Sequence, residues 1–237
     1  MKLRLNKVIK AYKQKEVLQE IDFEFEENKI YGLLGRNGSG KTTLFNCIAG
    51  EIPLTRGTIA LEKEGISAPL GLQDIGYVVS TPVVPDFLTG REFIQFFLDL
   101  HQASIPDLKT PDEYFDQLQI DYPDRDILLK DYSHGMKNKM QMLVNIIWNA
   151  SVLLLDEPLT SFDVVAAQDM KDLLRSVKQG HIMILSTHIL EIALDLCDEI
   201  VVLVNGKLHL IEKPETEAAF KEAIIHYLMQ EQHNETD

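Results

Sequence analysis

A glycine-rich segment near the start of the chain carries the groups that a nucleotide's phosphates need. It matches the pattern G-x-x-x-x-G-K-[ST] and consists of Gly35, Arg36, Asn37, Gly38, Ser39, Gly40, Lys41 and Thr42. Glycines let backbone N–H groups turn inward around phosphate oxygens, and a helix that starts here adds partial positive charge. We expect Lys41 to reach the β- and γ-phosphates and to assist catalysis. We expect the Thr42 hydroxyl to coordinate Mg²⁺ and the adjoining Thr43 to contact the nucleotide with the loop.

Two acidic residues follow an apolar run at positions 152–155, which has the length of a buried strand. In α/β sheets, ligands bind at the carboxyl ends of the strands, where Asp156 and Glu157 are placed. We expect Asp156 to hold Mg²⁺ and Glu157 to polarise an attacking water. Alone, two acids after a strand more often start a helix. The phosphate-binding pattern upstream favours the catalytic interpretation.

The elements that must position these residues fall into three parts. Residues 1–84 are strand-rich, with one helix predicted over 40–49 and closed by Gly50. The predicted strands are 2–8, 21–25, 30–34, 58–61 and 75–79. From residue 151 the strands and helices alternate, and the apolar strands are typical of a parallel sheet covered on both faces. They are strands 152–155, 182–186 and 200–204, with helices 164–178 and 189–196 between them.

Residues 85–149 are predicted to be helical. Capping boxes start two helices, at Thr89 with Glu92 and at Thr110 with Glu113. We interpret the apolar positions of two helices as core, namely Phe93, Phe96, Phe97 and Leu100 in one, and Met136, Met140, Leu143, Val144 and Ile147 in the other.

The end of the chain has simpler signals. Asn205 and Gly206 predict a tight hairpin into a strand over 207–211. A final amphipathic helix then places Phe220, Ala223, Ile224, Tyr227 and Leu228 on one face. A polar tail follows, which we expect to be frayed.

The composition is that of an ordinary globular protein, with 237 residues of which 45% are apolar and 25% charged. A formal charge of −14 repels nucleic acid backbones, so we expect no nucleic acid partner. Cys47 and Cys197 are interpreted as buried small hydrophobes in a reducing compartment. The sequence contains no run of about eighteen apolar residues and no signal peptide core. If the protein works at a membrane, we therefore expect a separate subunit to span it.

The order of motifs over residues 2–212 resembles the nucleotide-binding subunit of ABC transporters. Between the two motifs described above, the segment 132–137 reads Tyr-Ser-His-Gly-Met-Lys, which is similar to the family's LSGGQ signature. The resemblance implies an α/β fold, a P-loop NTPase (RecA-like) core with an antiparallel β subdomain and an inserted helical subdomain. The core and β subdomain then comprise 1–84 and 150–212, the helical subdomain 85–149, and a C-terminal helix and tail 213–237.

The resemblance also implies a shared site. Ser133 and Gly135 of one subunit would close over the γ-phosphate held by a second ATPase subunit, identical or different, arranged head to tail. Asp163, in Ser161-Phe-Asp163, resembles the family's D-loop, and His188 resembles the switch histidine that orients water and stabilises developing charge. Tyr12 matches the aromatic residue that stacks on adenine in relatives.

Three positions depart from the family's pattern. Relatives place a glutamine that touches Mg²⁺ where this chain has Ser80, whose hydroxyl can still coordinate the metal but reaches less far. His134 and Met136 stand where glycine and glutamine are commoner in the signature. Signatures with methionine resemble those of exporter-type ATPases.

The function implied by the resemblance is Mg²⁺-dependent ATP hydrolysis that energises transport, in the direction of export, through a membrane-spanning subunit. The protein would then lie in the cytoplasm, peripheral on the inner face of the cell membrane. The alternative is a soluble ABC-type ATPase acting in protein-complex assembly, for example in iron–sulfur cluster biogenesis. DNA-repair relatives insert a long coiled coil between the two nucleotide-binding motifs, and no sustained heptads occur between Lys41 and Asp156 here.

Overall fold

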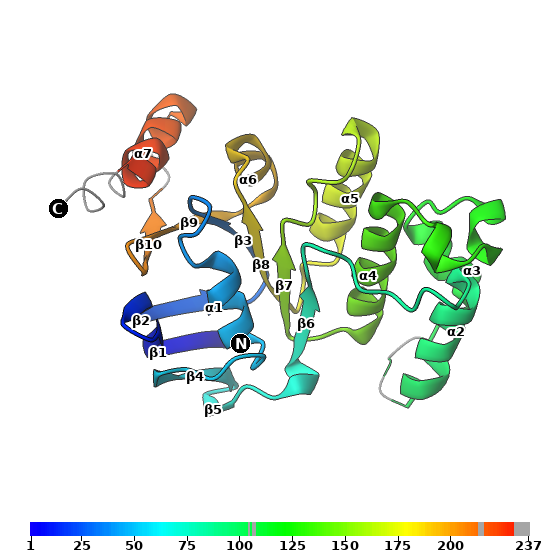
Figure 1. Cartoon of the computed structure of the whole chain (residues 1–237), viewed down its shortest axis with the longest axis horizontal. Coiled ribbons are helices and arrows are strands. Elements are labelled where there is room, and N and C mark those ends of the chain that lie inside the picture. The colour runs from blue at the N-terminus through cyan, green and yellow to red at the C-terminus, as the bar shows by residue number, and fades with distance from the viewer. Residues whose placement is uncertain (104, 106–107, 213–215, 230–237) are drawn as a thin grey trace.

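The computed structural model describes residues 1–103, 105, 108–212 and 216–229. Its centre is a six-stranded sheet with the strand order β10-β9-β3-β8-β7-β6 (Figure 1). All neighbouring strands are parallel except β10 and β9, which form an antiparallel hairpin. The strands are β3 (Lys29–Leu34), β6 (Ile75–Val78), β7 (Val152–Asp156), β8 (Ile182–Thr187), β9 (Glu199–Val204) and β10 (Lys207–Ile211). The predicted parallel sheet is therefore confirmed.

A second, antiparallel sheet has the order β2-β1-β4-β5. It consists of β1 (Lys2–Tyr12), β2 (Lys15–Glu26), β4 (Arg56–Lys63) and β5 (Ile66–Pro69). Helix α1 (Lys41–Ile48) lies between the two sheets (Figure 1), and its Leu44 and Phe45 share one buried cluster with Phe25 of the antiparallel sheet and Val152 and Ile184 of the parallel sheet. The two sheets thus clamp the helix that starts at the phosphate-binding loop.

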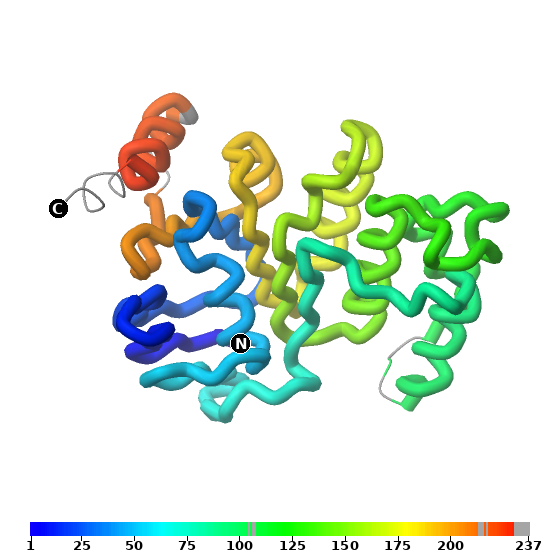
Figure 2. Tube along the Cα trace, viewed as in Figure 1, coloured from blue at the N-terminus to red at the C-terminus, as the bar shows by residue number. Residues whose placement is uncertain are grey.

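The remaining helices are α2 (Gly90–His101), α3 (Pro111–Gln117), α4 (His134–Trp148), α5 (Val164–Ser176), α6 (Leu190–Leu196) and α7 (Glu217–Met229). They lie beside the parallel sheet, except α2 and α3, which lie beyond α4 (Figure 1). Short 3₁₀ turns are formed by Leu72–Asp74, Tyr122–Asp126 and Leu129–Asp131. Figure 2 shows the chain leaving the sheet after β6, building α2 and α3 on the side away from the antiparallel sheet, and returning through α4 to β7.

Several local predictions are confirmed. Both capping boxes form, with Glu92 N–H donating to Thr89 Oγ1 and Glu113 N–H to Thr110 Oγ1. The hairpin between β9 and β10 turns at Asn205 and Gly206, which both have positive φ. Cys47 and Cys197 are free thiols, and burial raises the pKa of each. Residues 230–237 of the predicted tail lie outside the described residues.

The predicted buried face of α2 is wrong at two of its four positions. Phe96 and Leu100 are 59% and 64% exposed, whereas Ile94 and Leu98 are buried. Phe93 and Phe97 pack at the edge of the same core. Five of the six residues from 93 to 98 are apolar, so their spacing does not single out one stripe, and packing against α4 decides which stripe is covered.

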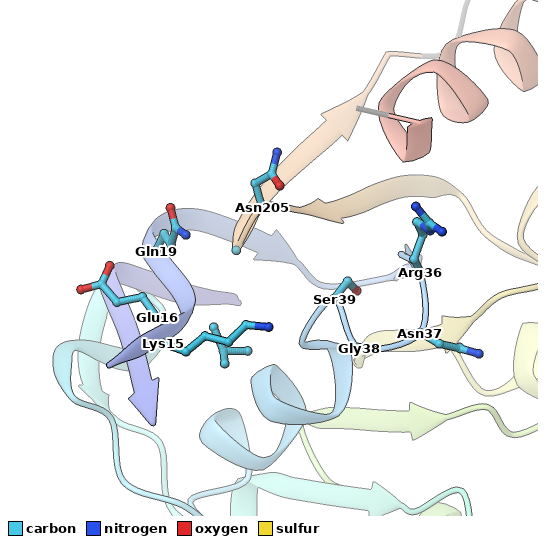
Figure 3. Close-up of a pocket in the computed structure, with 10 residues that line it drawn as sticks. Lys15, Glu16, Gln19, Arg36, Asn37, Gly38, Ser39 and Asn205 are labelled. Carbon is cyan, nitrogen blue, oxygen red and sulfur yellow. The ribbon is translucent and has the colours of Figure 1, made fainter. Parts of the chain in front are cut away.

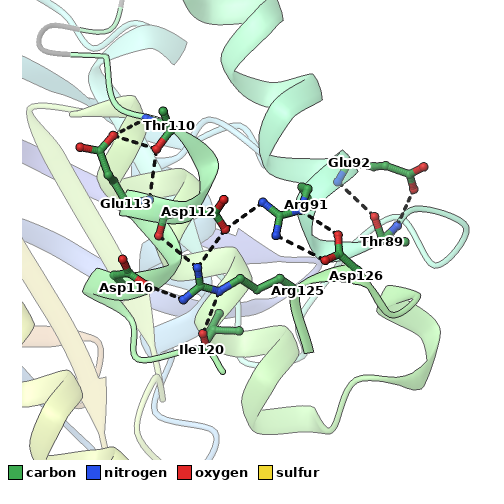
Figure 4. A network of polar contacts seen from close by, with 10 residues as sticks. All are labelled: Thr89, Arg91, Glu92, Thr110, Asp112, Glu113, Asp116, Ile120, Arg125 and Asp126. Carbon is green, nitrogen blue, oxygen red and sulfur yellow. Dashed lines mark hydrogen bonds and ion pairs between the residues drawn. The ribbon is translucent and has the colours of Figure 1, made fainter. Parts of the chain in front are cut away.

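A network of charges holds the helical subdomain together (Figure 4). The buried guanidinium of Arg125 donates to Asp112 Oδ1 at 2.9 Å, to Asp116 Oδ1 at 2.5 Å and to the Ile120 carbonyl at 3.0 Å. Arg91 on α2 donates to the same Asp112 oxygen at 2.8 Å. Arg125 and Arg91 hold the pKa of the Asp112 carboxyl below its usual value, so these ion pairs persist until the pH falls below the ordinary carboxyl range.

We expect Arg125→Met to destabilise the protein, because methionine keeps the apolar stem but removes all of these hydrogen bonds. A loss of about 2 kcal/mol would lower Tm by about 4–8 °C in a domain of this size. Thermal unfolding followed by circular dichroism measures the shift. Arg175→Met is the matched control, since Arg175 pairs with Asp172 and Asp195 at the surface. Equal shifts in the two variants would contradict the role assigned to Arg125.

Candidate nucleotide-binding site

The loop between β3 and α1, which we call the P loop (residues 35–42), has the backbone shape that its glycines allow. Gly38 and Gly40 have φ of 85° and 107°, a region that other residues avoid. A Cβ on Gly35 would lie 2.5 Å from Ser39 Oγ and 3.0 Å from the Leu203 carbonyl. Side chains at Gly38 and Gly40 would strain the backbone, and one at Gly35 would crowd Ser39 and β9, which explains the glycine pattern physically.

Lys41 begins α1 and is buried. Its ammonium group donates to the carbonyls of Gly35 at 2.6 Å and Arg36 at 3.2 Å. These contacts bend the side chain back across the P loop. The positive charge is thereby held at the place where the loop's backbone N–H groups and the start of α1 also favour an anion.

Asp156 stands at the end of β7 and lies beside the P loop. The Thr42 hydroxyl donates to Asp156 Oδ2 at 3.0 Å, so two of the three predicted metal ligands are already in contact. Among the described residues there is no group of three or more His, Cys, Asp or Glu side chains that could hold a metal. A hydroxyl and one carboxylate suit Mg²⁺, which usually takes one or two protein oxygens and completes its shell with phosphate and water oxygens.

Glu157 is the next residue and has an unusual backbone, with φ of 51°. Its Oε1 lies 2.9 Å from His188 Nδ1. Its Oε2 is buried and has no hydrogen-bond partner among the residues that the structure describes. Buried polar atoms are normally paired, so this oxygen is suited to a water or ligand atom that arrives with the nucleotide.

Two pockets flank the P loop. One has a volume of about 350 Å³ and is lined by Val17, Asn37, Gly38, Gly40, Lys41, Thr42, Thr43, Ser80, Asp156 and Glu157. The other, of about 300 Å³, is shown in Figure 3 and lies between β2, with Lys15 extending toward the P loop, and the loop's Arg36, Asn37 and Ser39. Val17, Asn37 and Gly38 line both pockets, so the two are neighbours that one extended ligand can span.

The structure does not bring every predicted residue to these pockets. Tyr12 lines neither of the two, although it pairs with Lys15 across the hairpin of β1 and β2 and is half exposed. The ammonium of Lys10 lies 4.8 Å from the centre of its ring. One face of Tyr12 is thus occupied by a cation.

The signature residues also lie outside the two pockets. Ser133 caps α4 by accepting the N–H of Met136 at 3.2 Å. A Cβ on Gly135 would lie 3.2 Å from the Ser161 carbonyl. Asp163 caps α5 through the N–H groups of residues 165 and 166. Within one chain, the signature therefore packs on the segment after β7 and lines neither pocket beside the P loop.

Sequence reasoning missed two residues of the site. Val17 lines both pockets and lies 2.8 Å from where a Cβ on Gly40 would be. Ser186 contacts Asp156 and the backbone of Glu157. An apolar residue in an edge hairpin has no chemical signal. For Ser186 the only sequence signal was a weak one, namely its position two residues before His188.

Comparisons with known proteins agree with this geometry. The family model described as ABC transporter matches residues 18–160. The uncharacterized ABC transporter ATP-binding protein MJ1023 of Methanocaldococcus jannaschii is 33% identical over 209 residues, which cover 87% of this chain and 75% of that protein. Phospholipid-transporting ATPase ABCA3 of Mus musculus is 29% identical over 219 residues, covering 90% of this chain and 13% of that protein.

The fold has close counterparts among solved structures. One is the dimeric structure of a post-hydrolysis state of the ATP-binding cassette MJ0796 bound to ADP and Pi. It matches with a TM-score of 0.75 at 19% sequence identity, covering 90% of this chain and 100% of that chain. The architecture of two sheets and an inserted helical part is therefore shared, whatever the differences in sequence.

Proposed function

The chain belongs to the ABC transporter family of ATP-binding proteins, and on that basis we propose that it energises export through a separate membrane-spanning subunit. It binds and hydrolyses ATP, as its family does. The observation that carries the proposal is the convergence of the P loop, including Thr42, with Asp156 and Glu157 at one pocket. No helix among the described residues is long and apolar enough to cross a membrane.

The residues that line the pocket, together with His188 beside it, divide the chemistry between them. The P loop and Lys41 bind the phosphates, and Thr42 and Asp156, with the hydroxyl of Ser80, would hold Mg²⁺. The metal, when bound, neutralises charge that develops on the phosphate oxygens. Glu157 holds and polarises the attacking water through the oxygen that the described residues leave without a hydrogen-bond partner. His188 keeps the other oxygen of Glu157 in place and stabilises charge near the γ-phosphate.

We propose that the complete site needs a second subunit. Ser133, Gly135 and Asp163 offer a hydroxyl, backbone N–H groups and a carboxylate outside the pockets of their own chain. A head-to-tail pair would place this surface over the P loop of the partner. The dimeric arrangement of the cassette MJ0796 supports this, as does the exposure of Ser133 and Asp163.

The partner and direction rest on the relatives. ABCA3 is named a phospholipid-transporting ATPase, and Met136 gives the signature its exporter-like form. We therefore propose that the chain works at the inner face of the cell membrane with a polytopic subunit.

Within the site, we propose that Tyr12 stacks on adenine with the ring face that Lys10 leaves open.

The proposal is tested by purifying the tagged chain from detergent-solubilised membranes of its host. We expect a polytopic membrane protein to copurify in fixed proportion and the complex to hydrolyse ATP. Lys41→Ala should keep the membrane partner and lose hydrolysis, because it changes only the phosphate site. Recovery of both the wild-type chain and Lys41→Ala with soluble partners alone, with ATPase activity in the wild-type preparation, would contradict transport and favour the alternative of a complex-assembly ATPase.

A further inference from the structure

We infer that Ser186 is a positioning residue that sets both acidic side chains of the site at once. Its hydroxyl donates to Asp156 Oδ1 at 2.5 Å and accepts the N–H of Glu157 at 3.0 Å. The inference rests on the proposed function, because it concerns how the same pocket is prepared for hydrolysis. Ser186 lines neither pocket next to the P loop, so it acts through the two acids and not on the nucleotide.

The sheet places Ser186 where both contacts are possible. It stands near the end of β8, the strand between β3 and β7, and is paired in register with Asp156. Its exposed fraction is 0%. A hydroxyl carries one donor and can accept as well, and here both capacities serve the two acids. Water cannot easily replace such a buried group, so its removal leaves the acids without this support.

The contact with Asp156 determines which carboxylate oxygen faces the nucleotide. Oδ1 is taken by Ser186, and Oδ2 is the oxygen that accepts the Thr42 hydroxyl. A carboxylate held at one oxygen loses its freedom to rotate. Groups that orient a metal ligand in this way usually tune the affinity for the metal. Ser186 therefore presents Oδ2 of Asp156 to the place where Mg²⁺ would bind.

The contact with Glu157 determines the direction of the second acid. Glu157 is held with φ of 51°, a left-handed conformation that residues other than glycine rarely adopt. Its N–H donates to both the carbonyl and the hydroxyl of Ser186, at 3.2 and 3.0 Å. This bifurcated bond stabilises the turn that sends the Glu157 side chain toward His188. Loss of the hydroxyl leaves only the longer of the two hydrogen bonds, the one to the Ser186 carbonyl.

The neighbouring residue offers a matched control. Thr187 is also buried and also ends β8, but its hydroxyl accepts the N–H of Ile189 at 3.1 Å at the start of α6. This hydrogen bond does not involve either acid. Removing the Thr187 hydroxyl therefore tests the general effect of a lost buried hydroxyl on this strand, without the specific effect on Asp156 and Glu157.

The test compares Ser186→Ala, Ser186→Thr and Thr187→Val in the full chain. For Ser186→Ala we expect kcat to fall by about 10–100-fold with the KM for ATP changed by less than about threefold, as for other residues that orient metal ligands. The Mg²⁺ concentration for half-maximal binding of a fluorescent, non-hydrolysable ATP analogue should rise by about three- to tenfold. Ser186→Thr keeps the hydroxyl and should recover most of both values, and Thr187→Val should resemble the wild type.

Wild-type kcat and Mg²⁺ dependence in Ser186→Ala would overturn the inference, as would equal losses in Thr187→Val. If Ser186→Ala does not fold, Ser186→Cys takes its place, since a thiol fills similar space but donates weakly, and the same outcomes apply. The Mg²⁺ dependence of analogue binding also separates the two hypotheses. If the wild-type chain copurifies with no membrane partner, the proposed function is refuted. A raised Mg²⁺ requirement for analogue binding in Ser186→Ala would still support Ser186 as the residue that orients Asp156.

Discussion

Substituting Glu157 by glutamine should lower ATP turnover by about 10²–10⁴-fold, the range expected when a group that handles the proton or water is lost. Glutamine keeps the size and the hydrogen bond toward His188 but loses the negative charge that polarises the attacking water. Binding of ATP involves other groups, namely the P loop and Lys41. The variant should therefore bind ATP and stay in the closed, dimeric state.

Phosphate release and light scattering after gel filtration, each with ATP and Mg²⁺, measure the two effects. Glu191→Gln is the control, because Glu191 is an exposed carboxylate on α6, and it should keep wild-type turnover. Normal hydrolysis by Glu157→Gln would rule out the role of Glu157. A variant that remains monomeric with ATP and Mg²⁺ would rule out closure by nucleotide binding.

Replacing Ser133 by aspartate should also abolish turnover, for an electrostatic reason. Aspartate is as good a helix cap as serine, so α4 should begin normally. If Ser133 closes over the γ-phosphate of the partner subunit, the new carboxylate meets a phosphate of like charge and the dimer cannot close. Ser133→Asn keeps the cap without the charge, and we expect it to retain much of the activity. Equal loss in the two variants would point to the size or the hydroxyl of the serine and would contradict the electrostatic clash, because both substitutes keep the cap.

Mixing two inactive variants distinguishes a shared site from a site within one chain. Lys41→Ala removes the phosphate contact of its own subunit, and Ser133→Asp removes the contact made to the partner. Equal amounts, mixed and allowed to exchange subunits, should recover about a quarter of the wild-type turnover, since half of the dimers then carry one intact site. No recovery, although both variants form mixed dimers, would contradict the head-to-tail site.

The local features of this protein could be predicted because each is encoded by neighbouring residues. The P loop needs positive φ at Gly38 and Gly40, a demand that few other residues meet. The capping box at Thr89 is closed by a residue only three positions away, and the turn at Asn205 and Gly206 lies wholly within the hairpin. The order of strands and helices followed from patterns of the same short range. The resemblance to the family rested on short motifs of the same kind.

Contacts between distant segments could not be predicted in this way. Ser186 contacts Asp156 across thirty positions of the sequence, and it does so because β7 and β8 are paired in one register that a slip of one residue would destroy. The buried stripe of α2, with Ile94 inside and Phe96 outside, depends on where α4 lies. Strand β5, exposed throughout, has no apolar pattern and forms only because β4 provides an edge.

The phosphate-binding loop and the two acids were thus determined by the sequence, since their chemistry is carried by the residues themselves. How those acids are aimed was decided by the folded sheet. A carboxylate turns freely about its bonds until a neighbour holds one of its oxygens, and here the neighbour is the hydroxyl that β8 brings beside β7.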